Sequence, residues 1–139
     1  MSKSIVVGYD GTDGGHHALD EALRVAAEIG GDIVIVYAYD KILSGGELAD
    51  LDAVVKERGA AILTEAQGIA VAAGIASRVE FVEGRPAEVL VEVADACDAR
   101  FIVIGSYGER PIRGAIVGST PYKLIHLADR PVIVVRIPD

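Results

Sequence analysis

The sequence predicts a single α/β domain organised around a doubly wound parallel sheet. Five short apolar runs alternate with four segments of helical periodicity, and 139 residues is close to the length of one domain. Strands that alternate with helices pair in parallel, and the helices cover both faces of the sheet. We therefore expect residues 1–139 to form one five-stranded parallel sheet with helices on both faces.

The first half of the chain is predicted to form strand, helix, strand and helix. An apolar run at 5–7 ends at Gly8, and Thr12 or Asp13 can cap the helix whose apolar positions extend over 18–29. Two glycines then close this helix, and the continuous apolar run 33–39 predicts the second strand. A loop over 40–46 leads to a long amphipathic helix over 51–73, which Gly74 stops.

The second half repeats the alternation. The segment 79–83 partly alternates between apolar and polar residues, which favours an edge strand, and Pro86 suits the first position of a helix. Cys97 continues the apolar stripe of that helix, so we expect a buried thiol. The last elements are a strand over 101–104, a loop from Ser106 to about residue 115, a helix over 118–128 and a strand over 131–137.

Composition limits the partners of the protein. The chain has 13 basic and 21 acidic residues, a net charge of −8, so phosphate-rich nucleic acid is repelled and no nucleic-acid partner is expected. A single cysteine fits a reducing cytoplasm. No apolar run approaches the roughly 20 residues that a membrane span needs, so we expect a cytoplasmic protein without a membrane partner.

Two glycine-containing segments follow strands at the place where such folds bind ligands. One is the segment from Gly8 to Thr12, after the first strand. The other follows the fourth strand and ends in Gly118-Ser119-Thr120, at the start of a helix. Free N–H groups, hydroxyls and the positive end of the helix dipole make such a helix start suitable for an anion.

The spacing of these residues resembles the nucleotide motif of the universal stress protein family. Gly105, two residues, Gly108, nine residues and Gly118-Ser119 match its G-x2-G-x9-G-S pattern, and Tyr9-Asp10 after the first strand resembles the adenosine side of the family's site. The resemblance covers the whole chain. It implies the strand order 3-2-1-4-5, with the first and fourth strands at the switch point.

The resemblance also implies an adenine nucleotide as ligand, with ATP as the first candidate. In this sequence Tyr9, Asp10 and the backbone at Ala38 would hold the adenosine. The resemblance implies as well a homodimer that forms through the last strand, over residues 132–137, and a role in stress response or signalling.

The rest of the implied site would hold the phosphates. Gly105 and Gly108 would let the chain pass close to ribose and phosphate groups, and Gly118, Ser119 and Thr120 would hold the phosphate tail. Mg²⁺ would accompany the phosphates. The motif contains no catalytic residue and no metal ligand supplied by the protein, so the expected nucleotide-binding residues are Tyr9, Asp10, Ala38, Gly105, Gly108, Gly118, Ser119 and Thr120.

Four residues depart from the family pattern. Glu109 stands where a basic residue is common, Pro111 where glycine is common, Pro121 where serine, threonine or alanine is usual, and Gly15 where serine is frequent. These departures leave AMP, ADP or a cyclic nucleotide open as the ligand.

Simpler interpretations stand beside the motif. The glycines could form a strand–loop–helix turn without a ligand, and Asp10 could cap a turn or a helix. Arg110 and Arg113 could be solvated loop charges rather than phosphate ligands. We therefore keep two alternatives to a nucleotide-binding switch: a dimeric interaction module with a degenerate pocket, and a weak ATPase. No residue is placed to activate water, so any hydrolysis should be slow.

Overall fold

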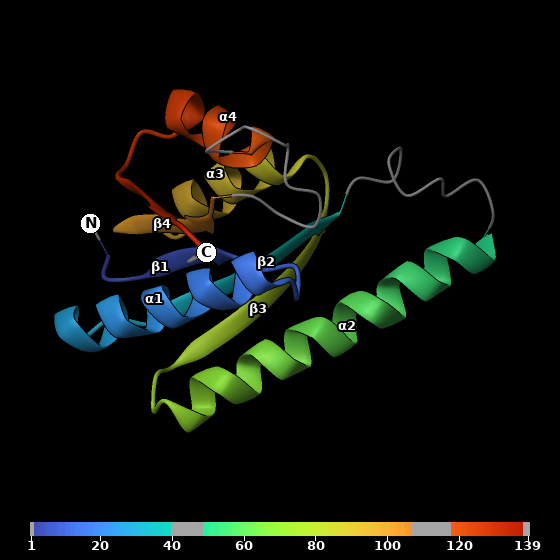
Figure 1. Cartoon of the computed structure of the whole chain (residues 1–139), viewed down its shortest axis with the longest axis horizontal. Helices are drawn as coiled ribbons and strands as arrows, with labels where there is room; N and C mark the ends of the chain where they lie inside the picture. The colour runs from blue at the N-terminus through green and yellow to red at the C-terminus, as the bar shows by residue number, and fades with distance from the viewer. Residues whose placement is uncertain (1, 40–48, 107–117, 138–139) are drawn as a thin grey trace.

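Five parallel strands form the centre of the molecule in the order β3-β2-β1-β4-β5 (Figure 1). The computed structural model describes residues 2–39, 49–106 and 118–137. The elements are β1 (Ile5–Gly8), α1 (Asp13–Ile29), β2 (Ile33–Tyr39), α2 (Ala49–Ala72), β3 (Ser77–Glu83), α3 (Pro86–Ala96), β4 (Phe101–Gly105), α4 (Ser119–Leu127) and β5 (Val132–Val135). The predicted α/β class, the parallel pairing and the strand order are confirmed.

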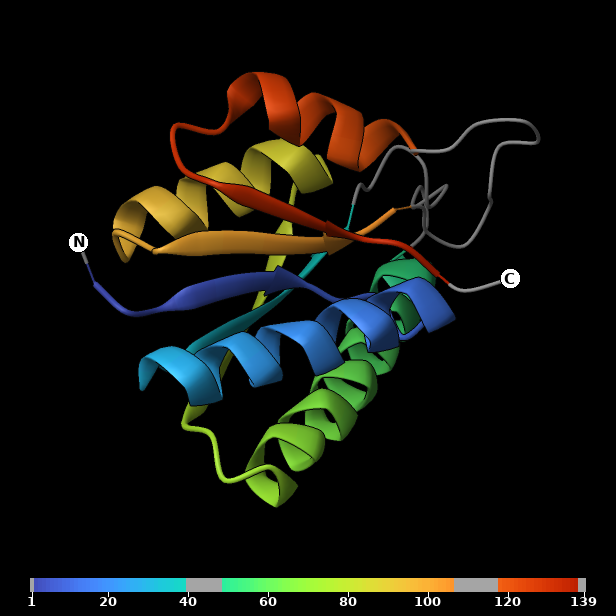
Figure 2. The same cartoon turned by 60° about the vertical axis from the view of Figure 1, so that its left-hand side comes forward.

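Two separate cores hold the helices against the sheet. Odd-numbered strand residues such as Ile5 and Ile35 pack with α1 and α2, and even-numbered ones such as Val6 and Val34 pack with α3 and α4. Successive side chains of a strand point to opposite faces, so continuous apolar runs serve both cores. Figure 2 shows the two helix pairs on opposite sides of the sheet.

Capping residues set both ends of α1, as the sequence predicts. The hydroxyl of Thr12 accepts a hydrogen bond from the N–H of Gly15, so Thr12 is the N-cap and α1 begins at Asp13, five residues before its first apolar position. At its other end Gly30 has a φ of 69°, the left-handed conformation that glycine adopts without strain. The last strand is shorter than expected and ends at Val135.

Cys97 is half-buried, so the expectation of a buried thiol was wrong. The helix α3 ends at Ala96 and Cys97 is its C-cap, where it packs against the edge of the core and stays partly exposed. Its Sγ lies 3.8 Å from the carbonyl oxygen of Ala94.

None of the helices in the described ranges is long and apolar enough to cross a membrane.

The contact between α2 and β3 depends on a glycine. A Cβ at Gly59 would lie 2.6 Å from the ring of Phe81. That ring is held between two tyrosines, with ring centroids 5.5 Å from Tyr37 and 4.5 Å from Tyr39. Gly68, in the same helix, has nothing within 4 Å of such a Cβ.

Two alanine substitutions in α2 should therefore have opposite effects on stability. Gly59→Ala should lower the free energy of unfolding by about 1–3 kcal/mol, because Phe81 cannot move without disturbing both tyrosines. Gly68→Ala should raise it by about 0.5–1 kcal/mol, because alanine favours the helix. Urea denaturation measures both changes, and equal effects of the two substitutions would contradict this account of the packing.

Candidate functional site

The carboxyl ends of β1 and β4 open onto a pocket of about 150 Å³. The two strands are neighbours, but the chain leaves β1 toward α1 on one face of the sheet, while α4, which follows β4, packs on the other. This divergence creates the crevice in which doubly wound sheets bind ligands. The lining residues are Gly8, Tyr9, Asp10, Gly15, Val36, Ala38, Pro86, Leu90, Ile104, Gly105, Thr120 and Pro121.

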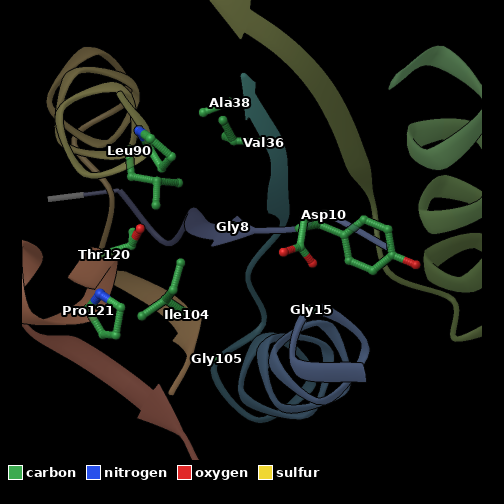
Figure 3. A pocket seen from close by; sticks show the side chains of 12 residues that line it. Gly8, Asp10, Gly15, Val36, Ala38, Leu90, Ile104, Gly105, Thr120 and Pro121 are labelled. Carbon is green, nitrogen blue, oxygen red and sulfur yellow. The ribbon is translucent and has the colours of Figure 1, made fainter. Parts of the chain in front are cut away.

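The wall of this pocket is apolar on the side of α3. Val36 in the middle of β2, Leu90 of α3 and Ile104 of β4 face it together (Figure 3). A Cβ at Gly8 would lie 2.7 Å from Cδ1 of Ile104 and 3.2 Å from Cδ1 of Leu90, so glycine lets these side chains close the floor. A site of this size and polarity suits one flat, apolar ring system.

Among the described residues that line the pocket, Asp10 is the only charged one. Its Oδ1 accepts hydrogen bonds from the N–H of Thr12, at 3.0 Å, and from the hydroxyl of Thr12. Within the described ranges Oδ2 has no hydrogen-bond partner, and Figure 3 shows the carboxylate at the border of the pocket. The free oxygen can therefore accept a hydrogen bond from a hydroxyl or amine of a ligand.

The start of α4 forms the opposite side of the site. Thr120 and Pro121 line the pocket, and Gly118 is the N-cap, with its own N–H bonded to the carbonyl oxygen of Ser106. Ser119 is exposed and begins the helix. Because the first N–H groups of a helix have no partner within it, those of Ser119 and Thr120 can donate to an anion, whereas Pro121 has none to donate.

Gly105 has a structural role of its own. A Cβ at this position would lie 2.8 Å from the carbonyl oxygen of Gly14, in the first turn of α1. Glycine at 105 therefore lets α1 start close to the end of β4, whether or not a ligand is bound. From the sequence we expected Gly105 to make room for a ligand. That role stays a prediction, and the packing against α1 is a separate reason for glycine at this position.

The side chain of Tyr9 lies on the face of α1 and α2. Only 2% of the residue is exposed, and its hydroxyl donates a hydrogen bond to Oε1 of Glu65 at 2.9 Å. His16 joins the cluster, with Nε2 at 3.2 Å from the Tyr9 hydroxyl oxygen and 3.3 Å from Oε1 of Glu65. Burial and the Glu65 carboxylate raise the pKa of Tyr9 well above its ordinary range.

A second pocket, of about 500 Å³, lies between the end of β2 and the helix α2. Its walls include Tyr37, Tyr39, Arg58 and Glu65, and Asp10 borders this pocket as well as the first. Asp10 is therefore shared by the two pockets. Among the described residues no three His, Cys, Asp or Glu side chains are grouped so that they could hold a metal ion.

The structure brings together five of the eight predicted site residues, Tyr9, Asp10, Ala38, Gly105 and Thr120. Gly118 and Ser119 do not line the pocket, but they directly precede Thr120 at the start of α4. Gly108, with Glu109, Arg110, Pro111 and Arg113, falls outside the described residues.

Sequence reasoning missed the apolar wall of the pocket. Val36 and Ile104 were assigned only to strands, and Pro86 and Leu90 only to a helix. A signal was present, because even-numbered residues near the carboxyl ends of strands share one face of the sheet. What the sequence could not supply is which helix covers that face.

Known proteins share this fold and sequence pattern. The family model described as "Universal stress protein family" matches residues 1–136. A universal stress protein of Mycobacterium tuberculosis is 34% identical, over 96% of each chain.

Two solved structures of similar proteins contain nucleotides. One is a universal stress protein in complex with cAMP, 30% identical over 99% of this chain and 98% of that one, with a TM-score of 0.77. The other is the universal stress protein from Archaeoglobus fulgidus in complex with dAMP, 27% identical over 96% of this chain and 97% of that one, with a TM-score of 0.74.

The Tyr9 cluster leads to a prediction about alkaline stability. The raised pKa means that folding favours the neutral phenol, while an unfolded tyrosine ionises from about pH 10. The stabilisation is complete below that pH and is lost as the pH rises above it. Tyr9→Phe should cost about 1 kcal/mol at neutral pH, through the lost hydrogen bond, and the deficit should shrink above about pH 10.

Chemical denaturation of wild type and Tyr9→Phe over a range of pH measures this deficit. A deficit that stays constant or grows at alkaline pH would show that the buried phenol is not preferentially neutral.

Proposed function

The chain belongs to the universal stress protein family, and on this basis we propose that it binds an adenine nucleotide at the carboxyl ends of β1 and β4. The observation that carries the proposal is the pocket itself. It combines an apolar wall from Val36, Leu90 and Ile104, a carboxylate at one border and a helix start at the other.

The adenosine part of the ligand fits the pocket best. A cavity of about 150 Å³ with apolar walls suits the base alone, and the Asp10 carboxylate suits the hydroxyl or amine groups of adenosine. Ala38 at the end of β2 offers its backbone beside the base. Since the Tyr9 side chain is engaged with Glu65 and His16, we assign Tyr9 a contribution through its main chain.

The phosphates would extend toward α4. The N–H groups of Ser119 and Thr120 and the positive end of the helix dipole would hold them, with Gly118 allowing a close approach. Gly105 and Gly108 would border the path, as the family motif implies. No basic side chain lines the pocket among the described residues, so Mg²⁺ would reach the site with the phosphates rather than through protein ligands of its own.

ATP is the first candidate, and AMP or a cyclic nucleotide is the second. The similar proteins with cAMP and dAMP support an adenine nucleotide without selecting among phosphate tails. Pro121 removes one N–H from the start of α4, so AMP, ADP or a cyclic nucleotide stays open beside ATP. We propose that occupancy of this site serves signalling in the stress response in the cytoplasm, with at most slow hydrolysis.

We further propose a homodimer that forms through the last strand. β5 is the edge of the sheet, and all four of its residues are half-buried. The carbonyl oxygen of Pro131 accepts a hydrogen bond from the N–H of Ile102 in β4, and that of Val135 accepts one from the N–H of Ser106 just after it. The backbone groups of Val132 and Val134 therefore point away from β4. An unpaired apolar edge favours addition of another strand.

The nucleotide proposal predicts a thermal shift that depends on Gly118. ATP or AMP at about 100 times its Kd should stabilise the protein by about 2.7 kcal/mol, which raises the Tm by several degrees. Gly118→Val should abolish the shift by filling the phosphate path. The variant should still fold, because φ of −75° and ψ of −179° are extended angles that any residue adopts.

Differential scanning fluorimetry with ATP, AMP and cAMP measures the shift, with Gly68→Ala as the matched control. No shift with any of the three would contradict nucleotide binding, and a degenerate interaction module would then be the better description. Steady turnover of ATP that is lost on Asp10→Ala or Ser119→Ala would instead favour the weak ATPase.

The dimer proposal predicts that Val134→Pro yields a folded monomer. Proline removes an N–H that faces the open edge, so it should block pairing with a second copy while sparing the bonds to β4. Analytical ultracentrifugation of wild type and variant measures the change. A monomeric wild type, or a variant that remains dimeric, would contradict the proposed interface.

A further inference from the structure

The second pocket, of about 500 Å³, exists because α2 packs over β3 and leaves the carboxyl end of β2 half open. Gly59 of α2 meets the ring of Phe81 in β3. In the neighbouring strand, Tyr37 and Tyr39 point to the same face, because side chains two residues apart in a strand share a face. Both tyrosines stay half-exposed and line the pocket.

The apolar part of this pocket consists of flat rings beside aliphatic side chains. Phe81 packs against both tyrosines, edge-on to Tyr37 with an interplanar angle of 82°, and tilted by 33° to Tyr39. Val55 and Ile62 of α2 line the pocket from the side of the helix. Such a surface suits an apolar side chain of a ligand, aromatic or aliphatic.

Charged groups of both signs border the same pocket. Arg58 and Glu65 of α2 line it together with Asp10. The guanidinium of Arg58 has no hydrogen bond or ion pair within the described ranges. Oε1 of Glu65 is engaged with Tyr9 and His16, whereas Oε2 has no partner among the described residues. A cation and a carboxylate oxygen are therefore both available to a ligand.

The two available charges lie on one stripe of α2. Arg58, Ile62 and Glu65 are four and three residues apart, so they share a face of the helix. The seven residues from Arg58 to Glu65 span about 10 Å along the helix axis. Both side chains are long enough to approach one small molecule from two sides. A ligand with a single charge would face a group of its own sign here, whereas a ligand with both charges matches both groups.

We propose that the second pocket binds an α-amino acid with an apolar side chain. The carboxylate of the ligand pairs with the guanidinium of Arg58, and its ammonium group donates to Glu65. The apolar side chain lies on Tyr37 and Tyr39. This site goes beyond the proposed nucleotide site and does not depend on it, although Asp10 borders both pockets.

Three related compounds test the proposal on the wild-type protein. L-Phenylalanine carries both charges, phenylpropanoate only the carboxylate, and phenylethylamine only the ammonium group. Isothermal titration should show the tightest binding for L-phenylalanine and binding about tenfold weaker, or more, for the other two, because each lacks one charge-assisted hydrogen bond. In a ¹H–¹⁵N spectrum, L-phenylalanine should shift the amide resonances of Tyr37, Tyr39 and Ile62. The resonance of Leu90, which lines only the first pocket, should stay in place.

Two variants separate the two charges. Arg58→Ala should weaken binding of L-phenylalanine about tenfold and leave phenylethylamine unaffected, because only a carboxylate pairs with the guanidinium. Glu65→Gln should weaken L-phenylalanine and phenylethylamine and spare phenylpropanoate. Arg58→Lys should restore binding only in part, because an ammonium group lacks the fork that matches a carboxylate. Arg24→Ala removes an exposed arginine from α1 and is the matched control, without effect on any of the three compounds.

Several results would overturn the proposal. One is that none of the three compounds shifts Tyr37, Tyr39 or Ile62 at millimolar concentration. Another is a singly charged compound that binds as tightly as L-phenylalanine, or an Arg58→Ala protein that binds L-phenylalanine as well as wild type does. L-Phenylalanine that displaces AMP and shifts Leu90 would belong to the first pocket instead. A wild-type protein that binds neither AMP nor ATP contradicts only the proposed function, because the ligand series and its variants use no nucleotide.

Discussion

The site depends on how closely the first turn of α1 approaches the ends of β1 and β4. A side chain at position 105 would strike the carbonyl oxygen of Gly14. Glycine at this position brings a helix start and a strand end together in a space of a few ångströms. The divergence of the chain after β1 and β4 then leaves the crevice that α3 and α4 complete.

This arrangement explains how an acidic protein can have a site for a phosphate compound. The chain carries a net charge of −8, and of the described residues that line the pocket the charged one is Asp10. Binding would then rely on apolar contacts with the base and on N–H groups at the start of α4, which carry partial positive charge. Such a site favours one small ligand and gives a nucleic-acid backbone no broad basic surface.

The fold was largely predictable because each strand is a short apolar run and each helix has its own period. Capping and steric contacts decide the details of the fold that the sequence did not predict. The sequence offered Thr12 or Asp13 as the cap of α1, and the hydrogen bond between Thr12 and Gly15 selects Thr12. Cys97 is half-buried rather than buried because α3 ends at Ala96, the residue before it. In the site, the motif indicated Asp10 and Thr120, but the wall formed by Val36 and Leu90 emerges only when the sheet and α3 meet.

The central claim is that the crevice between β1 and β4 holds an adenine nucleotide. Equilibrium dialysis of the purified protein against ATP, AMP and cAMP, followed by denaturation and chromatography of what is released, tests it most directly. The account predicts that one adenine nucleotide is retained, approaching one molecule per chain, and that Gly118→Val retains none. A wild-type protein that releases no adenine nucleotide after dialysis against all three would contradict the account.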